Sequence, residues 1–449
     1  MATGVVIDVR QELDRSPIRP FHWLLVILVG VATLFDGYDT VNPAYVIHYV
    51  ARPWHLTPAN AGFLVSAGLI GFAIGSVVHG VVADRVGRRP TMIAGLLIGG
   101  VFSVLTAALA GSFASFVALR ILTGLGLGVI LPLGVAYLNE YLNASWRNLV
   151  ISVGSPGFMV GAVLASILGI FLTPTWGWQA LYWAGAAGIV IAGIFLFVFP
   201  ESAEYLVRRG RSAEIARLLT RLHPSRRERY AAATFTTSGR IAGRRAWREW
   251  IETLSPRYLR TTIALWVTAF FVLFCIYGLQ GWTPTVMIER RASFATGFAF
   301  GAILQGFGIL GGWAAGYIAD RLIGQRPTIA LFSGLGALAA VLVGLVHLIA
   351  VDVAGVAALG FFIIGAQGIL NNFCAMSYPV QVRAAGEGFM LGLGRIGGLL
   401  GPYVGGVALG AFRTTDALFV TVAIAAVLAV VAIAATGATR TAAYVPAEA

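Results

Sequence analysis

The sequence contains no lysine and few charged residues of any kind. Only 11% of its 449 residues are charged and 58% are hydrophobic, whereas a soluble globular protein has roughly 25% charged residues. The two cysteines, Cys275 and Cys374, lie in separate apolar stretches, and the six histidines are scattered. These scarcities argue against a disulfide scaffold, a metal site and a cofactor. We therefore expect a membrane protein that is not an enzyme.

In place of charge, the sequence has long apolar runs bounded by glycine, proline and arginine. A run of about 20 residues crosses a hydrocarbon core roughly 30 Å thick, and only a helix satisfies its own backbone polar groups there. We expect an all-α membrane protein with twelve transmembrane helices. They are predicted near residues 22–46, 58–82, 91–110, 113–138, 149–172, 178–199, 260–287, 294–318, 327–349, 353–378, 388–411 and 415–436.

Arginine placement indicates how these helices are oriented. Most of the 31 positive residues fall in one set of loops, which includes the N-terminus and the segment between the two groups of six helices. The opposite loops hold only Arg52, Arg290, Arg291 and Arg413. The positive-inside rule then predicts cytoplasmic termini in a multi-pass protein of the bacterial inner membrane. The net charge of +12 marks orientation in a lipid bilayer, and nucleic acid is not an expected partner.

An internal repeat divides the chain. GVVADRVGRRPT at 80–91 is echoed by GYIADRLIGQRPT at 316–328, and Arg147 has its counterpart in Arg383. Both copies follow the second helix of a six-helix half on the same side of the membrane, so the repeat is parallel and resembles that of the major facilitator superfamily. We expect halves at 1–199 and 259–449, a linker at 200–258, and a substrate site between the halves near the midplane.

The linker contains one amphipathic segment. Ile215, Leu218, Leu219 and Leu222 share a helical face, and arginines occupy the rest of the wheel. This pattern predicts a helix lying at the inner lipid headgroups. We interpret residues 200–258 as a connection between the halves, with a regulatory role left open.

The repeated motif resembles the loop 2 to 3 signature of the superfamily. Its glycines permit tight turns, and its charged side chains can exchange ion pairs as the halves move. We expect a conformational latch formed by Gly80, Asp84, Arg85, Gly87, Arg88, Arg89, Asp320 and Arg321, and an inner gate that includes Glu140, Arg147 and Arg383.

Two acids lie within the first predicted helix. Asp36 and Asp39 are three residues apart and project from one helical face. An ionisable group inside a membrane costs several kcal/mol to bury and usually has a function. Because two close carboxylates do not both ionise easily, we expect one of them to gain and lose a proton near neutral pH. A purely structural role for the pair is the alternative.

Two arginines are also predicted to be buried. Arg120 and Asp36 fall at similar depths in their helices, so an ion pair between them is feasible, and protonation of the acid would free the guanidinium for an anionic substrate. Arg395 is the second buried cation. With two acids and two arginines the empty site is neutral, and entry of a monocarboxylate together with one proton keeps it neutral.

The chain resembles the aromatic acid:proton symporters of the major facilitator superfamily, which include the 4-hydroxybenzoate and benzoate transporters. The matching stretches are DGYD at 36–39, GWTP near Trp282, Gln305 with GGWAAGYIADR, and GAQGILNNFCAMSYPVQVRAAGEG at 365–388. The resemblance implies import of an aromatic acid with protons. It implies proton coupling by Asp36 and Asp39, and substrate binding by Arg120, Arg395, Tyr38, Gln367, Asn371 and Asn372. We expect the protein to act as a monomer.

Other functions are weaker readings of the same residues. PESAEYLVRRGR at 200–211 is similar to a sugar-porter sequence, but sugar porters lack DGYD. The fifth predicted helix lacks the glycine-proline pattern of drug antiporters. A porter for another organic anion, or a membrane sensor that binds ligand without transporting it, remains open.

Overall fold

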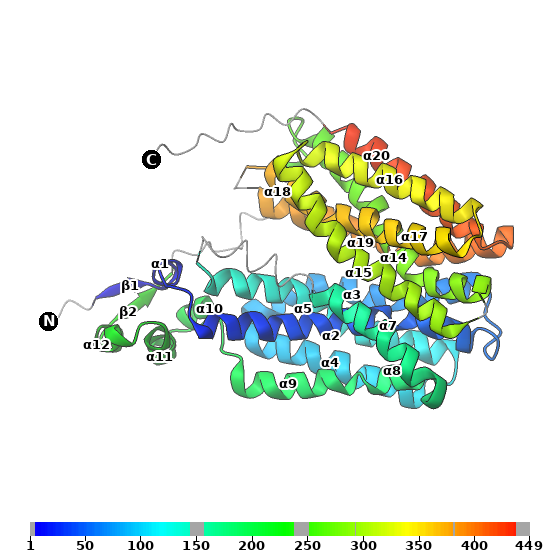
Figure 1. The fold of residues 1–449 in the computed structure, drawn as a ribbon. Helices are drawn as coiled ribbons and strands as arrows, with labels where there is room; N and C mark the ends of the chain where they lie inside the picture. The colour runs from blue at the N-terminus through cyan, green and yellow to red at the C-terminus, as the bar shows by residue number, and fades with distance from the viewer. Residues whose placement is uncertain (1–4, 144–156, 238–250, 292, 380–381, 437–449) are drawn as a thin grey trace. The chain divides into compact units, whose positions relative to one another are not determined.

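The computed structural model describes residues 5–143, 157–237, 251–291, 293–379 and 382–436, and the described chain is mostly helical (Figure 1). The long helices are α2 (Pro20–Val50), α3 (Pro58–Val86), α4 (Arg88–Leu109), α5 (Phe113–Tyr141), α7 (Gly157–Trp176), α14 (Leu259–Arg291), α15 (Phe294–Arg321), α16 (Gln325–Leu345), α19 (Arg383–Phe412) and α20 (Asp416–Ala434). Two further segments are interrupted. One is α8 (Gln179–Trp183) followed by α9 (Ala186–Val198), and the other is α17 (Ile349–Leu359), a π-helical turn η2 (Gly360–Ile364) and α18 (Gly365–Ser377).

The twelve predicted segments correspond to these elements. Among the described residues, eleven helices are long and apolar enough to cross a membrane, and α19 occupies the other predicted segment. At the interruption of the sixth segment, Gly185 lies against Ser103, where an added Cβ would come within 2.2 Å of the serine hydroxyl. The beginning of the predicted helix at 149–172 lies outside the described residues.

The chain forms two compact units that do not coincide with the predicted halves. The first contains residues 1–40, 70–161 and 179–241, and the second contains 41–69, 162–178 and 242–449. Helices α2, α3 and α7 therefore contribute to both units. The division of the chain at 199 and 259 stays a prediction.

In the first unit, helices approach closely where they carry glycine. A Cβ on Gly126 of α5 would lie 2.5 Å from the carbonyl oxygen of Gly95 on α4. A Cβ on Gly37 of α2 would lie 1.8 Å from the carbonyl oxygen of Phe158 on α7. No side chain fits at either position, so these glycines fix the spacing of the helices that carry the buried charges.

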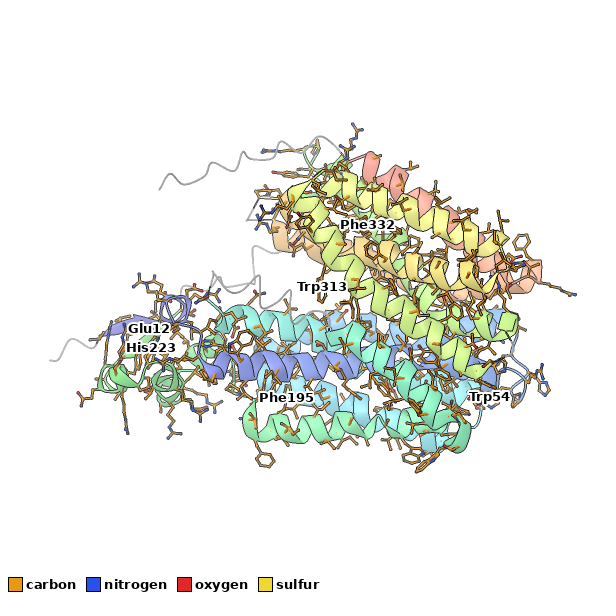
Figure 2. The ribbon with its side chains drawn as sticks, viewed as in Figure 1. Glu12, Trp54, Phe195, His223, Trp313 and Phe332 are labelled. Atoms are coloured by element: carbon orange, nitrogen blue, oxygen red, sulfur yellow. The ribbon has the colours of Figure 1, made fainter. Side chains whose placement is uncertain are left out.

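A small cap lies at one end of the first unit (Figure 1). Its chain-terminal part is β1 (Val6–Asp8) and α1 (Val9–Asp14), and its later part is α10 (Ala203–Arg208), α11 (Ser212–Leu222), the 3-10 turn η1 (Pro224–Arg226), α12 (Arg227–Ala231) and β2 (Thr234–Thr236). The two strands pair in parallel, with Ile7 opposite Phe235. Glu12 and His223 lie close to each other in this cap (Figure 2).

The amphipathic helix is confirmed as α11, but its apolar face does not lie on lipid. Ile215, Leu218, Leu219 and Leu222 are buried in one cluster with Ile7, Leu13 and Phe235. The expected position at the headgroups is wrong because the sequence pattern of a single helix does not reveal that the N-terminal segment covers it.

In the second unit, glycines again allow close packing. A Cβ on Gly397 of α19 would lie 2.0 Å from the carbonyl oxygen of Phe270 on α14, and one on Gly62 of α3 would lie 2.3 Å from that of Pro402. Large apolar side chains such as Trp313 and Leu345 are exposed at 63% and 73%. Exposed apolar surface of this kind suits contact with lipid.

Candidate functional site

The centre of the candidate site is a buried ion pair in the first unit. Arg120 of α5 and Asp39 of α2 are 1% and 0% exposed. The guanidinium Nη1 donates to Asp39 Oδ2 over 2.6 Å, and Nη2 donates to the Asp39 carbonyl oxygen over 3.0 Å. The hydrogen-bonded carboxylate of Arg120 is thus that of Asp39, whereas the sequence had made a pair with Asp36 feasible. Asp36 and Asp39 lie about one helical turn apart, so their depth in the helix does not decide which of them Arg120 contacts.

Two residues that the sequence analysis missed complete this group. Ser103 of α4 donates its hydroxyl to Asp39 Oδ1 over 2.6 Å. The ring of Tyr182 on α8 lies 5.3 Å from the Arg120 guanidinium carbon, a cation-π distance, and Phe116 packs edge-on against that ring. A lone serine in an apolar run usually bonds its own helix backbone, so its sequence gave no signal.

The other members of the DGYD motif have different surroundings. Asp36 is completely buried, and Thr40 donates to its Oδ1 over 3.3 Å. Tyr38 donates its hydroxyl to the carbonyl oxygen of Leu181 over 2.7 Å. That bond holds the tyrosine against the start of the sixth span.

The latch motif forms a charged group at the start of α4. Gly87 has φ +115°, a conformation that favours glycine, and the backbone N–H groups of Arg88 and Arg89 donate to Glu201 Oε1 over 2.9 and 3.1 Å. Arg88 also pairs with Glu140 at 2.5 Å, and Ser202 donates to the same carboxylate. The structure thus joins Arg88 with the predicted gate residue Glu140.

The remaining latch and gate residues are more loosely held. Asp84 is exposed and lies 3.8 Å from Arg208, and the carbonyl oxygen of Arg85 accepts a hydrogen bond from Arg209. Gly80 has open space around its α-carbon. Arg147 lies outside the described residues. Three residues are exposed at helix ends: Asp320, Arg321 and Arg383.

The candidate substrate residues of the second unit lie on α18 and α19. Arg395 is half-buried on α19. Gln367 donates to Asn371 of the same helix over 3.0 Å, and Asn371 and Asn372 are exposed. Gln280, a residue that the sequence analysis did not single out, donates instead to the buried Gln305 over 3.1 Å.

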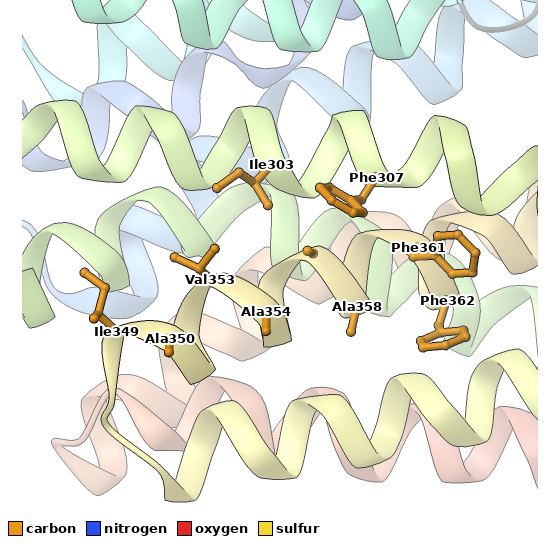
Figure 3. A pocket seen from close by; sticks show the side chains of 10 residues that line it. Ile303, Phe307, Ile349, Ala350, Val353, Ala354, Ala358, Phe361 and Phe362 are labelled. Atoms are coloured by element: carbon orange, nitrogen blue, oxygen red, sulfur yellow. The ribbon is translucent and has the colours of Figure 1, made fainter.

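A cavity of about 750 Å³ lies between α15 and α17 in the second unit (Figure 3). All ten lining residues are apolar, among them Phe307, Phe361 and Phe362. A site without a charged or polar side chain does not match a carboxylate. We therefore do not assign the substrate to this cavity.

Metal chemistry has no support in the part of the chain that the structure describes. Within those residues no group of three or more His, Cys, Asp or Glu side chains could hold a metal ion. Cys275 and Cys374 are both buried and unbridged.

A bundle of apolar helices that encloses a buried Asp–Arg pair is the architecture of a multi-pass membrane transporter. The family model described as Major Facilitator Superfamily matches residues 27–402. The chain belongs to the major facilitator superfamily, as its sequence predicted, and it is a transporter rather than an enzyme.

The curated relatives match the chain over nearly its whole length. It is 34% identical to the "Gallate transporter" of Pseudomonas putida, over 94% of this chain and 93% of that protein. It is 31% identical to the "4-hydroxybenzoate transporter PcaK" of Pseudomonas aeruginosa, over 94% of each. Among solved structures, it has a TM-score of 0.71 and 16% identity with a bacterial homolog of the human lysosomal transporter Spinster, over 94% of this chain and 98% of that one. That structural likeness establishes the fold.

Proposed function

We propose that this protein is a symporter that imports an aromatic carboxylate together with protons. The buried pair of Arg120 and Asp39 carries the proposal. A charged pair inside a membrane helix bundle is costly to keep, and protonation of the acid lets the arginine bind another anion. The names of its relatives, transporters of gallate and of 4-hydroxybenzoate, support an aromatic acid as the substrate class.

The geometry suggests how proton and substrate are coupled. With Asp39 ionised, its carboxylate occupies Nη1 of Arg120. A proton on Asp39 weakens that pair and leaves the planar guanidinium able to bind a substrate carboxylate with two hydrogen bonds. One anion and one proton enter together, so the net charge of the group does not change. Asp36 is the second acid that we assign to proton transfer.

The other assignments follow from the family resemblance and the charged contacts. We assign substrate contacts to Arg395, Tyr38, Gln367, Asn371 and Asn372. The pair of Arg88 with Glu140 is assigned to the latch that opens and closes one end of the bundle during alternating access.

We further propose that the protein lies in the bacterial inner membrane with both termini and the cap in the cytoplasm. The arginine-rich helix α11 and the N-terminal strand belong to one cap, so both lie on the same side of the membrane. The excess of arginine on that side supports a cytoplasmic location.

Purified protein in sealed vesicles tests the function. An imposed inward proton gradient should drive accumulation of labelled 4-hydroxybenzoate above its outside concentration, and a protonophore should abolish the accumulation. Uptake whose rate and final level ignore the gradient would contradict symport, and uptake of glucose without any aromatic acid would contradict the substrate class.

A further inference from the structure

Two glutamines in the second unit share one hydrogen bond, and each has a further polar atom without a hydrogen-bond partner among the described residues. Gln280 of α14 donates its Nε2 to Oε1 of Gln305 on α15 over 3.1 Å, and Gln305 is only 2% exposed. Gln280 Oε1 and Gln305 Nε2 are buried and have no hydrogen-bond partner among the described residues. Exchanging the oxygen and nitrogen of both amides gives the same result, because one acceptor and one donor group still lack a partner.

Two more buried polar side chains in the same unit share this property. Asn42 of α2 and Thr283 of α14 are both 0% exposed. Neither the two amide atoms of Asn42 nor Oγ1 of Thr283 has a partner in the described part of the chain. Buried polar atoms in native proteins are nearly always hydrogen-bonded, so several such atoms in one region indicate a bound polar group.

Helical register brings these side chains to the same region. Tyr45 of α2 stacks on Phe298 of α15 with ring centres 4.4 Å apart, and its hydroxyl faces Gly301, where a Cβ would lie 2.2 Å away. Asn42 precedes Tyr45 by three residues and Gln305 follows Gly301 by four. Each therefore lies about one turn from the Tyr45 contact on the same helical face.

Helix α14 approaches the same place. Thr285 of α14 donates to the carbonyl oxygen of Ala44 on α2 over 3.4 Å. Thr283 and Gln280 lie within the next two turns of α14 toward its beginning, and Gln280 is already joined to Gln305. The four polar residues thus come from three helices that pack together beside an aromatic pair.

The chemistry of this group fits a neutral substituent on an aromatic ring. The group offers amide N–H donors and carbonyl acceptors but no charge, so it matches a hydroxyl, which donates one hydrogen bond and accepts others. A carboxylate, which only accepts, would leave the amide oxygens unpaired. The stacked rings of Tyr45 and Phe298 border this group with apolar surface.

We propose that Asn42, Gln280, Thr283 and Gln305 form a subsite that binds the ring hydroxyl of the transported aromatic acid. The subsite makes the protein prefer hydroxylated aromatic acids over the unsubstituted acid. This inference rests on the function proposed above and deepens it by naming the part of the substrate that sets selectivity.

Uptake kinetics of two matched substrates test the subsite. In Gln305→Met and Gln280→Met, the side chain keeps its length and loses its amide. We expect the KM for 4-hydroxybenzoate to rise roughly tenfold, because a site built to bind a hydroxyl is left with unpaired groups. The KM for benzoate should stay within about twofold of wild type, since benzoate offers no hydroxyl to those groups. Asn42→Leu should change selectivity in the same direction.

Gln179→Met is the matched control, because Gln179 is a half-buried glutamine at the start of a helix in the other unit. It should leave both KM values unchanged. Retained benzoate uptake in the Gln280 and Gln305 variants shows that they are folded and inserted.

Three outcomes overturn the subsite. One is a parallel change in the KM of both substrates, another is no change in either, and the third is a wild-type protein without preference for the hydroxylated acid. In all three the wild type still carries aromatic acids, so the proposed function survives. A wild type that carries no aromatic acid in the presence of a proton gradient overturns the proposed function and this inference together.

Discussion

Two buried arginines in this molecule are held in opposite ways. Arg120 in the first unit has one hydrogen-bonded carboxylate, Asp39, and within the described residues its Nε–H has no acceptor. Arg290 in the second unit is 7% exposed at its side chain and contacts two carboxylates, Asp352 at 3.0 Å and Asp416 at 2.7 Å.

The contacts of Arg290 go further than those two acids. Its Nε donates to Thr415, its Nη1 also donates to the carbonyl oxygen of Val343, and its guanidinium lies over the ring of Phe419. Every nitrogen of that group is bonded. A cation whose every nitrogen is bonded, to groups on several helices, fixes helix ends, whereas a cation hydrogen-bonded to one exchangeable carboxylate can release it. We therefore interpret Arg290 as structural and Arg120 as functional.

The largest expected effect distinguishes Asp39, the partner of Arg120, from Asp352, a partner of Arg290. Asp39→Asn should abolish proton-driven accumulation, because the amide cannot carry the proton and Arg120 loses its counter-charge. Asp352→Asn should leave transport per folded molecule close to wild type and lower thermal stability in detergent, by at most about 3 kcal/mol because Asp416 still neutralises Arg290. Labelled uptake in vesicles and a thermal melt measure the two quantities.

Normal accumulation in Asp39→Asn would remove the distinction between the regions. So would an Asp352→Asn protein that is stable but does not transport.

Arginine-to-lysine changes sharpen the same comparison. Arg120→Lys keeps the positive charge and loses the planar fork, so uptake of the carboxylate should fall by about tenfold or more. Arg290→Lys loses bonds to several helix ends and should reduce the melting temperature with a smaller change in uptake rate. Equal effects of both substitutions on uptake would show that Arg120 is no more than a scaffold cation.

The fold was largely predictable because membrane helices are specified by composition. A run of apolar residues at 294–318 has few structural alternatives in lipid, and α15 is found there. Gly126 and Gly128 of α5 belong to a glycine stripe in the sequence LRILTGLGLGVILP, a pattern that favours close helix packing, and both make such contacts in the structure.

Details set by tertiary contacts were not predictable. The choice of Asp39 over Asp36 depends on the rotation of α2 against α5, and the role of Ser103 depends on which face of α4 meets α2. The cap was missed because β1 and β2 have three residues each and lie far apart in the sequence. Strands that short have no periodicity to read.

A smaller effect is expected at the serine that bonds Asp39. Ser103→Ala removes one donor to the carboxylate while Arg120 remains, so about 1 kcal/mol is lost and uptake should slow roughly fivefold. Thr106→Val is the control, because the buried Thr106 hydroxyl bonds only the carbonyl oxygen of Phe102 in its own helix in the recorded contacts. The two variants should differ in initial uptake rate. Equal rates would show that the hydroxyl does not support Asp39.

The smallest effect on stability is expected in the cap, where Arg226 and Glu12 form a third, partly exposed arginine–carboxylate pair. Arg226 donates to Glu12 over 2.5 Å, and Tyr230 donates to the same carboxylate over 2.6 Å. Burial alone would raise the pKa of Glu12, but these two hydrogen bonds, together with the nearby charges of Arg226 and His223, more than offset it and hold the pKa below its ordinary value of about 4.5. Its stabilising contribution is therefore complete above about pH 4.5 and is lost only as the pH falls further.

His223 gives the cap a different pH window. Burial lowers the pKa of His223 from its ordinary value of about 6.5. The positive charges of Arg226 and Arg19 lower it further, whereas the negative charge of Glu12 raises it. A group that prefers to be neutral when folded contributes stability above its unfolded pKa, and that contribution shrinks as the pH falls below about 6.5.

Protection of the α1 amides against hydrogen exchange, corrected for intrinsic rates, should therefore decrease severalfold between pH 7.5 and 5.5. His223→Gln should remove most of this pH dependence, whereas Glu12→Gln should weaken protection at both pH values and leave a pH dependence in place, because His223 still titrates. A pH dependence unchanged by His223→Gln would assign it to another titratable group and leave the pair of Glu12 with Arg226 as a constant support at both pH values.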